Sequence, residues 1–158
     1  MRSLAVCFTV AWVILPGVAA AASVEDLFRQ FNLFGNWATE CDGPPSPSNP
    51  HVSIVTPSAG LVLEDHNLGP DFAVNRYSVL SAEPQSSTTL SVHVIFQPGT
   101  EVEERQKLIF LVRDNTRRTI YNETDSGVVR VKDGIAVVRG TKTPVLRKCG
   151  ADKASIVQ

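Results

Sequence analysis

Three histidines, His51, His66 and His93, are the residues of this 158-residue chain best suited to acid–base chemistry or metal binding. No two of them stand at the i, i+2 or i, i+4 spacing of a compact metal motif. Asp65 directly precedes His66 and could orient it as a base. The two fall in a predicted turn, however, where neighbouring side chains point apart and are usually solvated. The histidines therefore predict neither a metal site nor a catalytic base.

Other reactive residues also lack the neighbours that catalysis needs. Ser126 does not have the flanking glycine pattern of a nucleophile elbow. Glu101, Glu103 and Glu104 follow a Pro-Gly turn and are interpreted as a charged turn. No glycine-rich phosphate loop is present in the sequence. We therefore expect no enzymatic activity and no cofactor.

The charge distribution gives no sign of a polyanionic partner. The chain carries 15 Lys+Arg and 16 Asp+Glu, a formal net charge of -1, so nucleic acid is not expected to bind. The arginines between Arg113 and Arg118 alternate with polar residues and are interpreted as a solvated β-turn. Asn122-Glu123-Thr124 is an N-glycosylation sequon, which we expect to be silent outside a eukaryotic secretory pathway.

The beginning of the chain has the pattern of a secretory signal peptide. Met1-Arg2 precedes an apolar run from Leu4 to Leu15, and small residues follow. The run is shorter than the roughly 20 residues of a spanning helix. We expect cleavage after Ala20 or Ala22, which gives a signal peptide at 1–22 and one domain at 23–158. The mature chain would have no membrane span and a periplasmic or secreted location.

Removal of the signal peptide changes the cysteine count. Cys7 leaves, and Cys41 and Cys149 remain. Two cysteines in an exported domain favour a disulfide, with free thiols or an intermolecular bridge as the alternatives. A bridge between them would join the start of the domain to its end and stabilise it by up to about 5 kcal/mol.

The elements that would position these residues are mostly strands. Ser23 and Asp26 resemble a capping box, and Leu27, Phe28 and Phe31 share one face of a short helix that we expect to cover one end of the domain. The proline-rich segment 44–50 is predicted to be an irregular loop. Alternating hydrophobicity or short apolar runs predict strands near 37–41, 51–56, 61–64, 72–82, 90–96, 107–112, 119–122, 128–131, 135–138 and 145–149.

This pattern predicts an all-β fold, a small antiparallel up-and-down barrel with a short N-terminal helix, with a β-sandwich as the alternative. A disulfide between the first and last strands favours the barrel, because those strands would then lie side by side.

Gly35-Asn36-Trp37, followed by Cys41, resembles the Gly-x-Trp motif of lipocalins and related calycin-type barrels. It is also similar to the start of small exported bacterial proteins with a second Cys near the C-terminus, and bacterial alkaline-protease inhibitors share that kind of barrel. The resemblance implies that Gly35 and Trp37 form a structural motif in which Trp37 closes one end. It also implies that a basic side chain from a late strand, Arg139 or Arg147, packs over the indole.

Two classes of function follow. The first is an exported, non-enzymatic barrel that carries or senses a small apolar molecule or lipid, an expectation from fold analogy. The inward side chains that would contact the ligand, or alternatively fill the core, are Tyr77, Val79, Leu90, Val92, Val94, Phe96, Phe110 and Val112. The second is a protein-binding module, such as an inhibitor of an exported protease or an envelope accessory factor. It would use Ser23 to Phe31 or the rigid Pro44 to Pro50 loop.

Overall fold

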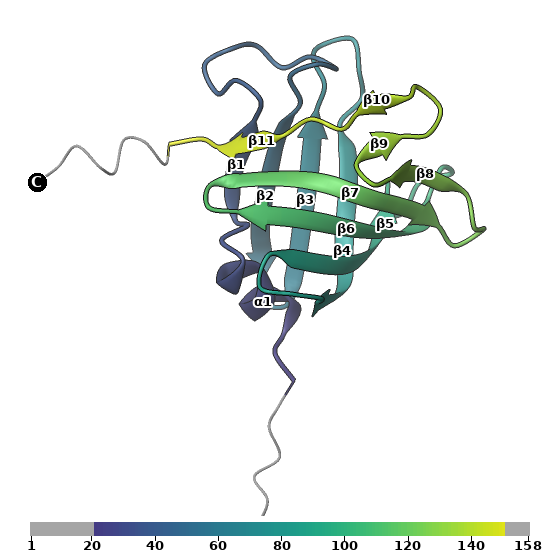
Figure 1. Ribbon diagram of the computed structural model, residues 1–158. Helices are drawn as coiled ribbons and strands as arrows, with labels where there is room; N and C mark the ends of the chain where they lie inside the picture. The colour runs from purple at the N-terminus through teal and green to yellow at the C-terminus, as the bar shows by residue number, and fades with distance from the viewer. Residues whose placement is uncertain (1–20, 151–158) are drawn as a thin grey trace, which may run out of the picture.

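The structure is a computed structural model that describes residues 21–150. The predicted signal peptide therefore lies outside the described residues except for Ala21 and Ala22. The described chain forms one helix and a series of strands (Figure 1). Their bounds are α1 Val24–Gln30, β1 Gly35–Ala38, β2 His51–Ser58, β3 Leu61–Asn67, β4 Asn75–Pro84, β5 Thr89–Phe96, β6 Glu104–Arg113, β7 Thr116–Thr124, β8 Val129–Lys132, β9 Ile135–Ala136, β10 Thr141–Lys142 and β11 Leu146–Lys148.

Eight of the strands close into an antiparallel barrel. Strands β1 to β7 pair with their neighbours in chain order, and β11 completes the ring by pairing with both β7 and β1. In the closing pairs, Leu146 lies opposite Arg117 and Trp37 lies opposite Lys148. The predicted up-and-down barrel is confirmed, and the sandwich alternative is not observed.

The segment between β7 and β11 forms a small flap of three strands, β8, β9 and β10, beside the barrel (Figure 1). The first half of β7 pairs with β11, whereas Asn122 and Glu123 in its second half pair with β8. Strand β10 was not predicted from the sequence. It has only two residues, both exposed, so no alternation could indicate it.

The N-terminal helix closes one end of the barrel. The Ser23 side chain accepts a hydrogen bond from the backbone of Asp26, whose carboxylate accepts one from the Ser23 backbone in return, which confirms the capping box. Leu27, Phe28 and Phe31 are buried in the main apolar cluster. The helix therefore covers the end of the barrel, as predicted.

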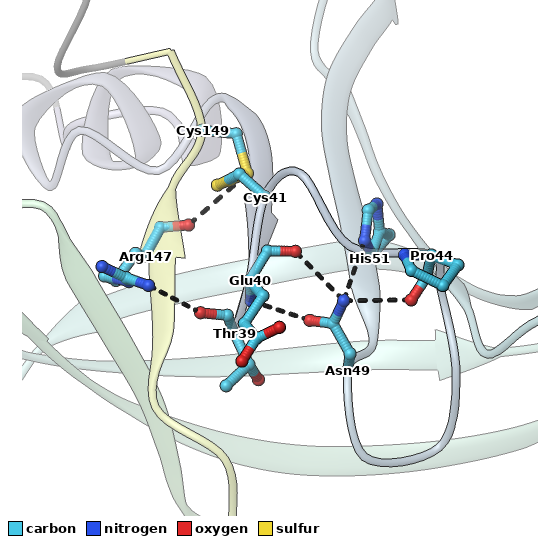
Figure 2. Close-up of a disulfide and its surroundings, with 8 residues drawn as sticks. All are labelled: Thr39, Glu40, Cys41, Pro44, Asn49, His51, Arg147 and Cys149. Atoms are coloured by element: carbon cyan, nitrogen blue, oxygen red, sulfur yellow. Dashed lines mark hydrogen bonds between the residues drawn. A yellow bond between two sulfur atoms is a disulfide. The ribbon is translucent and has the colours of Figure 1, made fainter.

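Trp37 is fully buried, and its indole nitrogen donates a hydrogen bond to the Leu33 carbonyl over 2.7 Å. The cations over the indole are Lys148 of β11, at 5.6 Å from the ring centroid, and Arg117 of β7, at 6.0 Å. The expectation that Arg139 or Arg147 would pack over the indole was therefore wrong. Arg147 is next to Lys148 on β11, so its side chain leaves the other face of the strand and donates to the Thr39 carbonyl (Figure 2).

The disulfide joins Cys41 and Cys149, whose Cα atoms lie 5.5 Å apart (Figure 2). It fixes the chain just beyond β1 to the chain just beyond β11, where the barrel closes. The predicted disulfide is confirmed.

The proline-rich loop that follows Cys41 is irregular but ordered around Asn49. The side-chain amide nitrogen of Asn49 donates to the carbonyls of Glu40 and Pro44, each over 3.0 Å, and its amide oxygen accepts from the Glu40 backbone N–H.

The interior is divided along the barrel axis. The half beside α1 is filled by apolar side chains, among them Leu33, Ile54, Val62, Leu90, Val92, Phe110 and Val112. The half away from α1 contains buried polar residues as well: Glu64, Gln106, Asn122 and Thr124, together with Arg117, whose side chain reaches Glu64. The polar half is where a site can be sought.

Candidate functional site: a polar cavity inside the barrel

A buried ion pair separates the apolar half of the interior from the polar half. Glu64 on β3 is 3% exposed, and Arg117 on β7 is 2% exposed. The guanidinium binds the carboxylate through both terminal nitrogens, with Nη1 donating to Oε2 over 3.0 Å. It also lies over the Phe110 ring, 4.5 Å from the centroid. Burial of two charges is tolerated here because each is the counter-ion of the other and the fork is bidentate.

His66 extends this pair toward the barrel mouth. Its Nε2 lies 2.5 Å from Oε1 of Glu64. Burial would raise the pKa of Glu64, but the charge of Arg117 and the hydrogen bond from His66 outweigh it and lower that pKa to about 2. Because the carboxylate is ionised, Nε2 of His66 must carry the hydrogen, and in the neutral ring Nδ1 is left as an acceptor.

A cavity of about 210 Å³ lies above the ion pair. The polar part of the lining comes from His66, Tyr77, Arg117, Arg118, Thr119, Asn122 and Thr143. The apolar part of the lining comes from Pro50, Val52, Leu108, Val131, Pro144 and Leu146. This volume is below the roughly 300 to 1,000 Å³ of pockets that bind drug-sized molecules. The cavity therefore suits a small molecule or one end of a longer one.

A chain of hydrogen bonds leads from the flap to the cavity wall. Arg130 on β8 pairs with Glu104 over 2.8 Å, Gln106 donates to Glu104 over 2.8 Å, and Asn122 donates to Gln106 over 2.9 Å. Asn122 is 8% exposed, and its Oδ1 is buried without a hydrogen-bond partner among residues 21–150. A buried acceptor without a partner is uncommon in folded proteins and calls for an explanation.

Tyr77 stands between two aromatic neighbours in the same wall. Its ring centroid lies 5.0 Å from that of His66 and 5.1 Å from that of Phe96. Burial and the nearby Glu64 charge raise the pKa of Tyr77 to about 12. The phenol is therefore neutral at physiological pH and can act as donor or acceptor.

The sequence-predicted contact residues are distributed between the two halves of the interior. Tyr77 lines the cavity, and Phe96 packs against it. The other six, Val79, Leu90, Val92, Val94, Phe110 and Val112, are buried members of the apolar cluster. Gly35 and Trp37 lie on β1, and Trp37 belongs to the apolar cluster that α1 covers.

Sequence reasoning placed two of the central residues wrongly. His66 is inside β3 rather than in a turn, and Arg117 is buried rather than solvated. The sequence did contain a signal that the strand predicted at 61–64 extends to His66. Val62, Glu64 and His66 are spaced two residues apart and so share one face of a strand. The sequon residue Asn122 faces the barrel interior, so its side chain is not exposed for modification.

Most charged groups of the site are paired. Glu64 pairs with Arg117, and Glu104 pairs with Arg130. Arg118 also lines the cavity and has no ion-pair partner among residues 21–150, and its guanidinium donates to the Thr143 hydroxyl and the Gly134 carbonyl. Residues 21–150 contain no group of three or more His, Cys, Asp or Glu side chains placed to hold a metal ion. No helix in that range has the length and apolar character needed to cross a membrane.

The fold and the cavity together define a small disulfide-closed β-barrel with a partly polar interior, compatible with a lipocalin-like barrel. Comparison of the chain with protein-family models, curated proteins and solved structures gave no match.

Proposed function

We propose that this protein is an exported, non-enzymatic binding barrel that holds a small molecule with an apolar body in the cavity beside Tyr77 and His66. The observation that carries the proposal is the 210 Å³ cavity itself, lined by residues of the barrel strands, the flap and adjoining loops. Its apolar walls can accept a chain or ring, while its polar residues can orient one end of it. A disulfide and a signal-peptide pattern support export to the periplasm or the exterior.

Filling the cavity tests the proposal. Leu108 on β6 is buried and lines the cavity, so Leu108→Trp should occupy the space that a ligand needs. We expect wild-type protein to bind 1-octanol in a calorimetric titration and Leu108→Trp to lose that binding by at least about tenfold, or about 1.4 kcal/mol. The matched control is Leu111→Trp, because Leu111 points to the outer face of the same strand. Equal binding by wild type and both variants would contradict the proposal.

A second candidate function, recognition of an acidic protein segment, is favoured by a groove outside the barrel. The groove, of about 560 Å³, runs between the proline-rich loop and the flap, and its lining includes Arg130, Arg139 and Lys142 but no acidic residue. Neither Arg139 nor Lys142 has an ion-pair partner within residues 21–150. By contrast, the side chains of Leu27, Phe28 and Phe31 are buried in the barrel, which leaves the loop as the segment able to meet a partner.

Charge reversal tests this second function. A fluorescein-labelled hexaglutamate peptide should bind the wild-type protein, with an affinity that falls as salt is added. Arg139→Glu with Lys142→Glu should abolish the binding, whereas Arg105→Glu with Lys107→Glu, an equal change of charge on β6, should not. Fluorescence anisotropy measures both. Equal losses in the two double variants would show only general charge attraction and would reject the groove.

A further inference from the structure

We infer that the cavity selects a ligand that carries a single negative charge at one end of its apolar body, as a carboxylate does, and that Arg118 binds this charge. The inference rests on the proposed function, because it names the chemistry of the ligand for the same cavity.

Arg118 reaches the cavity where β7 separates from β11. Strand β7 pairs with β11 up to Arg117 and with β8 from Asn122 onward. Arg118 lies between these two pairings and lines the cavity together with Thr143. Its Nε donates a hydrogen bond to the Thr143 hydroxyl over 3.0 Å, and its Nη2 donates to the Gly134 carbonyl. These two hydrogen bonds hold the guanidinium beside the cavity wall.

The guanidinium of Arg118 keeps donors free for a ligand. An arginine side chain has five N–H donors. In Arg118 the hydrogen bonds to Thr143 and Gly134 use two of them, and Nη1 donates none within residues 21–150. The side chain is partly buried and has no carboxylate partner in that range. An unpaired guanidinium in such a position favours a carboxylate, which it binds through charge-assisted hydrogen bonds.

The charges around the cavity indicate a ligand with one negative charge. No acidic residue is part of the lining described within residues 21–150, and its two cations are Arg117 and Arg118. Arg117 is engaged through both terminal nitrogens by Glu64, which leaves Arg118 as the unbalanced charge. A carboxylate balances it. A phosphate monoester, with a charge of about −2, would keep an excess negative charge, and an ammonium group would meet Arg118 as a like charge.

The surface next to the cavity is basic as well. Thr143 and Pro144 line both the cavity and the groove outside the barrel. The groove lining adds Arg139 and Lys142 and no acidic residue. A concave surface lined by charge of one sign raises the local concentration of ligands of the opposite sign. The groove therefore favours the approach of an anion to this end of the cavity.

Three probes with the same number of carbon atoms and different end charges test the preference. Octanoate is an anion at pH 7, 1-octanol is neutral, and octylammonium is a cation. We expect octanoate to bind the wild-type protein about tenfold more tightly than 1-octanol, because a hydrogen bond to a charged group is worth at least about that factor. Octylammonium should bind more weakly than either. Isothermal titration calorimetry gives the three dissociation constants, and Leu108→Trp should weaken the binding of octanoate as well as of 1-octanol.

Arg118→Gln removes the charge while keeping an N–H donor for Thr143. We expect the preference for octanoate over 1-octanol to fall to about onefold in this variant, with binding of 1-octanol retained. Arg105→Gln is the matched control, because it removes an equal charge from an exposed position on β6. It should keep the wild-type preference. Arg118→Lys keeps the charge and should keep part of the preference.

A measurement on the wild-type protein covers the case in which Arg118→Gln does not fold. With ¹⁵N-labelled arginine, the Nε–H resonance that is missing from the spectrum of Arg118→Lys belongs to Arg118. We expect octanoate to shift this resonance and 1-octanol to leave it nearly unchanged. An Nε–H resonance of Arg118 that does not respond to saturating octanoate would overturn its role.

The outcomes separate this inference from the proposed function. If no probe binds to the wild-type protein, both fail. If 1-octanol or octylammonium binds as tightly as octanoate, the cavity is a binding site but the preference for an anion is wrong. If Arg118→Gln retains the preference, or Arg105→Gln loses it to the same extent, Arg118 is not the cation that binds the ligand. The inference then fails while the proposed function stands.

Discussion

Replacing Arg117 with methionine is expected to lower the free energy of unfolding by about 3 to 5 kcal/mol. The substitution leaves Glu64 buried without its counter-ion, and an uncompensated charge in a protein interior carries a penalty of that size. Arg117 also packs over Phe110 and lies near Trp37, so the side chain contributes contacts as well as charge. Urea denaturation at pH 7, followed by tryptophan fluorescence, measures the change.

The double variant Glu64→Leu with Arg117→Met is the control for this prediction. Replacing both members of a buried ion pair with apolar residues is often neutral or stabilising, so we expect the double variant to be more stable than Arg117→Met alone. A single Arg117→Met variant as stable as the wild type would contradict the description of the pair as buried and mutually dependent.

The pH dependence of the same difference provides an independent readout. The pKa of Glu64 is lowered from 4.5 to about 2 in the folded protein. The stabilisation from this shift is therefore complete above pH 4.5 and is lost as the pH falls toward 2. Because Arg117 causes much of the lowering, the gap in stability between wild type and Arg117→Met should shrink over this interval. A gap that stays constant from pH 5 to pH 3 would count against the assigned role of Arg117.

Removing the disulfide is expected to have an effect of similar size. Cys41→Ser with Cys149→Ser should lower the free energy of unfolding by about 4 kcal/mol, since the bridge closes a loop with a sequence separation of 108. The bridge also holds β1 and β11 together where the barrel closes. These two strands are paired only at Trp37 with Lys148 and at Ala38 with Arg147. Denaturant unfolding of the double variant, compared with wild-type protein before and after reduction, measures the loss.

The wild-type protein serves as its own control in that experiment. Reduction should lower its stability to the level of the double variant, and mass spectrometry after alkylation reports whether the thiols are free. An unfolding midpoint that does not change on reduction would contradict a stabilising role for the bridge.

The fold was predictable because its apolar residues follow the period of a strand. Leu90, Val92 and Val94 alternate cleanly, and they all point into the barrel. The terminal cysteines indicated which strands must meet. Helix α1 was equally clear from its capping box and its clustered large apolar residues.

The polar half of the interior was not predictable for a physical reason. A polar residue at an inward position has the same pattern as one on the solvent face, so the buried Arg117 and the exposed Arg113 cannot be told apart by residue type. Strand β7 adds a register shift opposite Ile109 and Phe110, so its inward residues are Arg117 and Thr119 before the shift and Asn122 after it. The pairing partners on β6 determine which of them face the cavity, and these partners are defined only by the folded barrel.

The central claim is that the barrel cavity holds a small molecule with an apolar body, and native mass spectrometry of the protein purified from the cells that naturally make it tests this claim most directly. The account predicts a mass above that of the oxidised chain, and solvent extraction should release a small compound with an apolar body. A homogeneous mass equal to that of the chain alone, with nothing recovered by extraction, would contradict the claim.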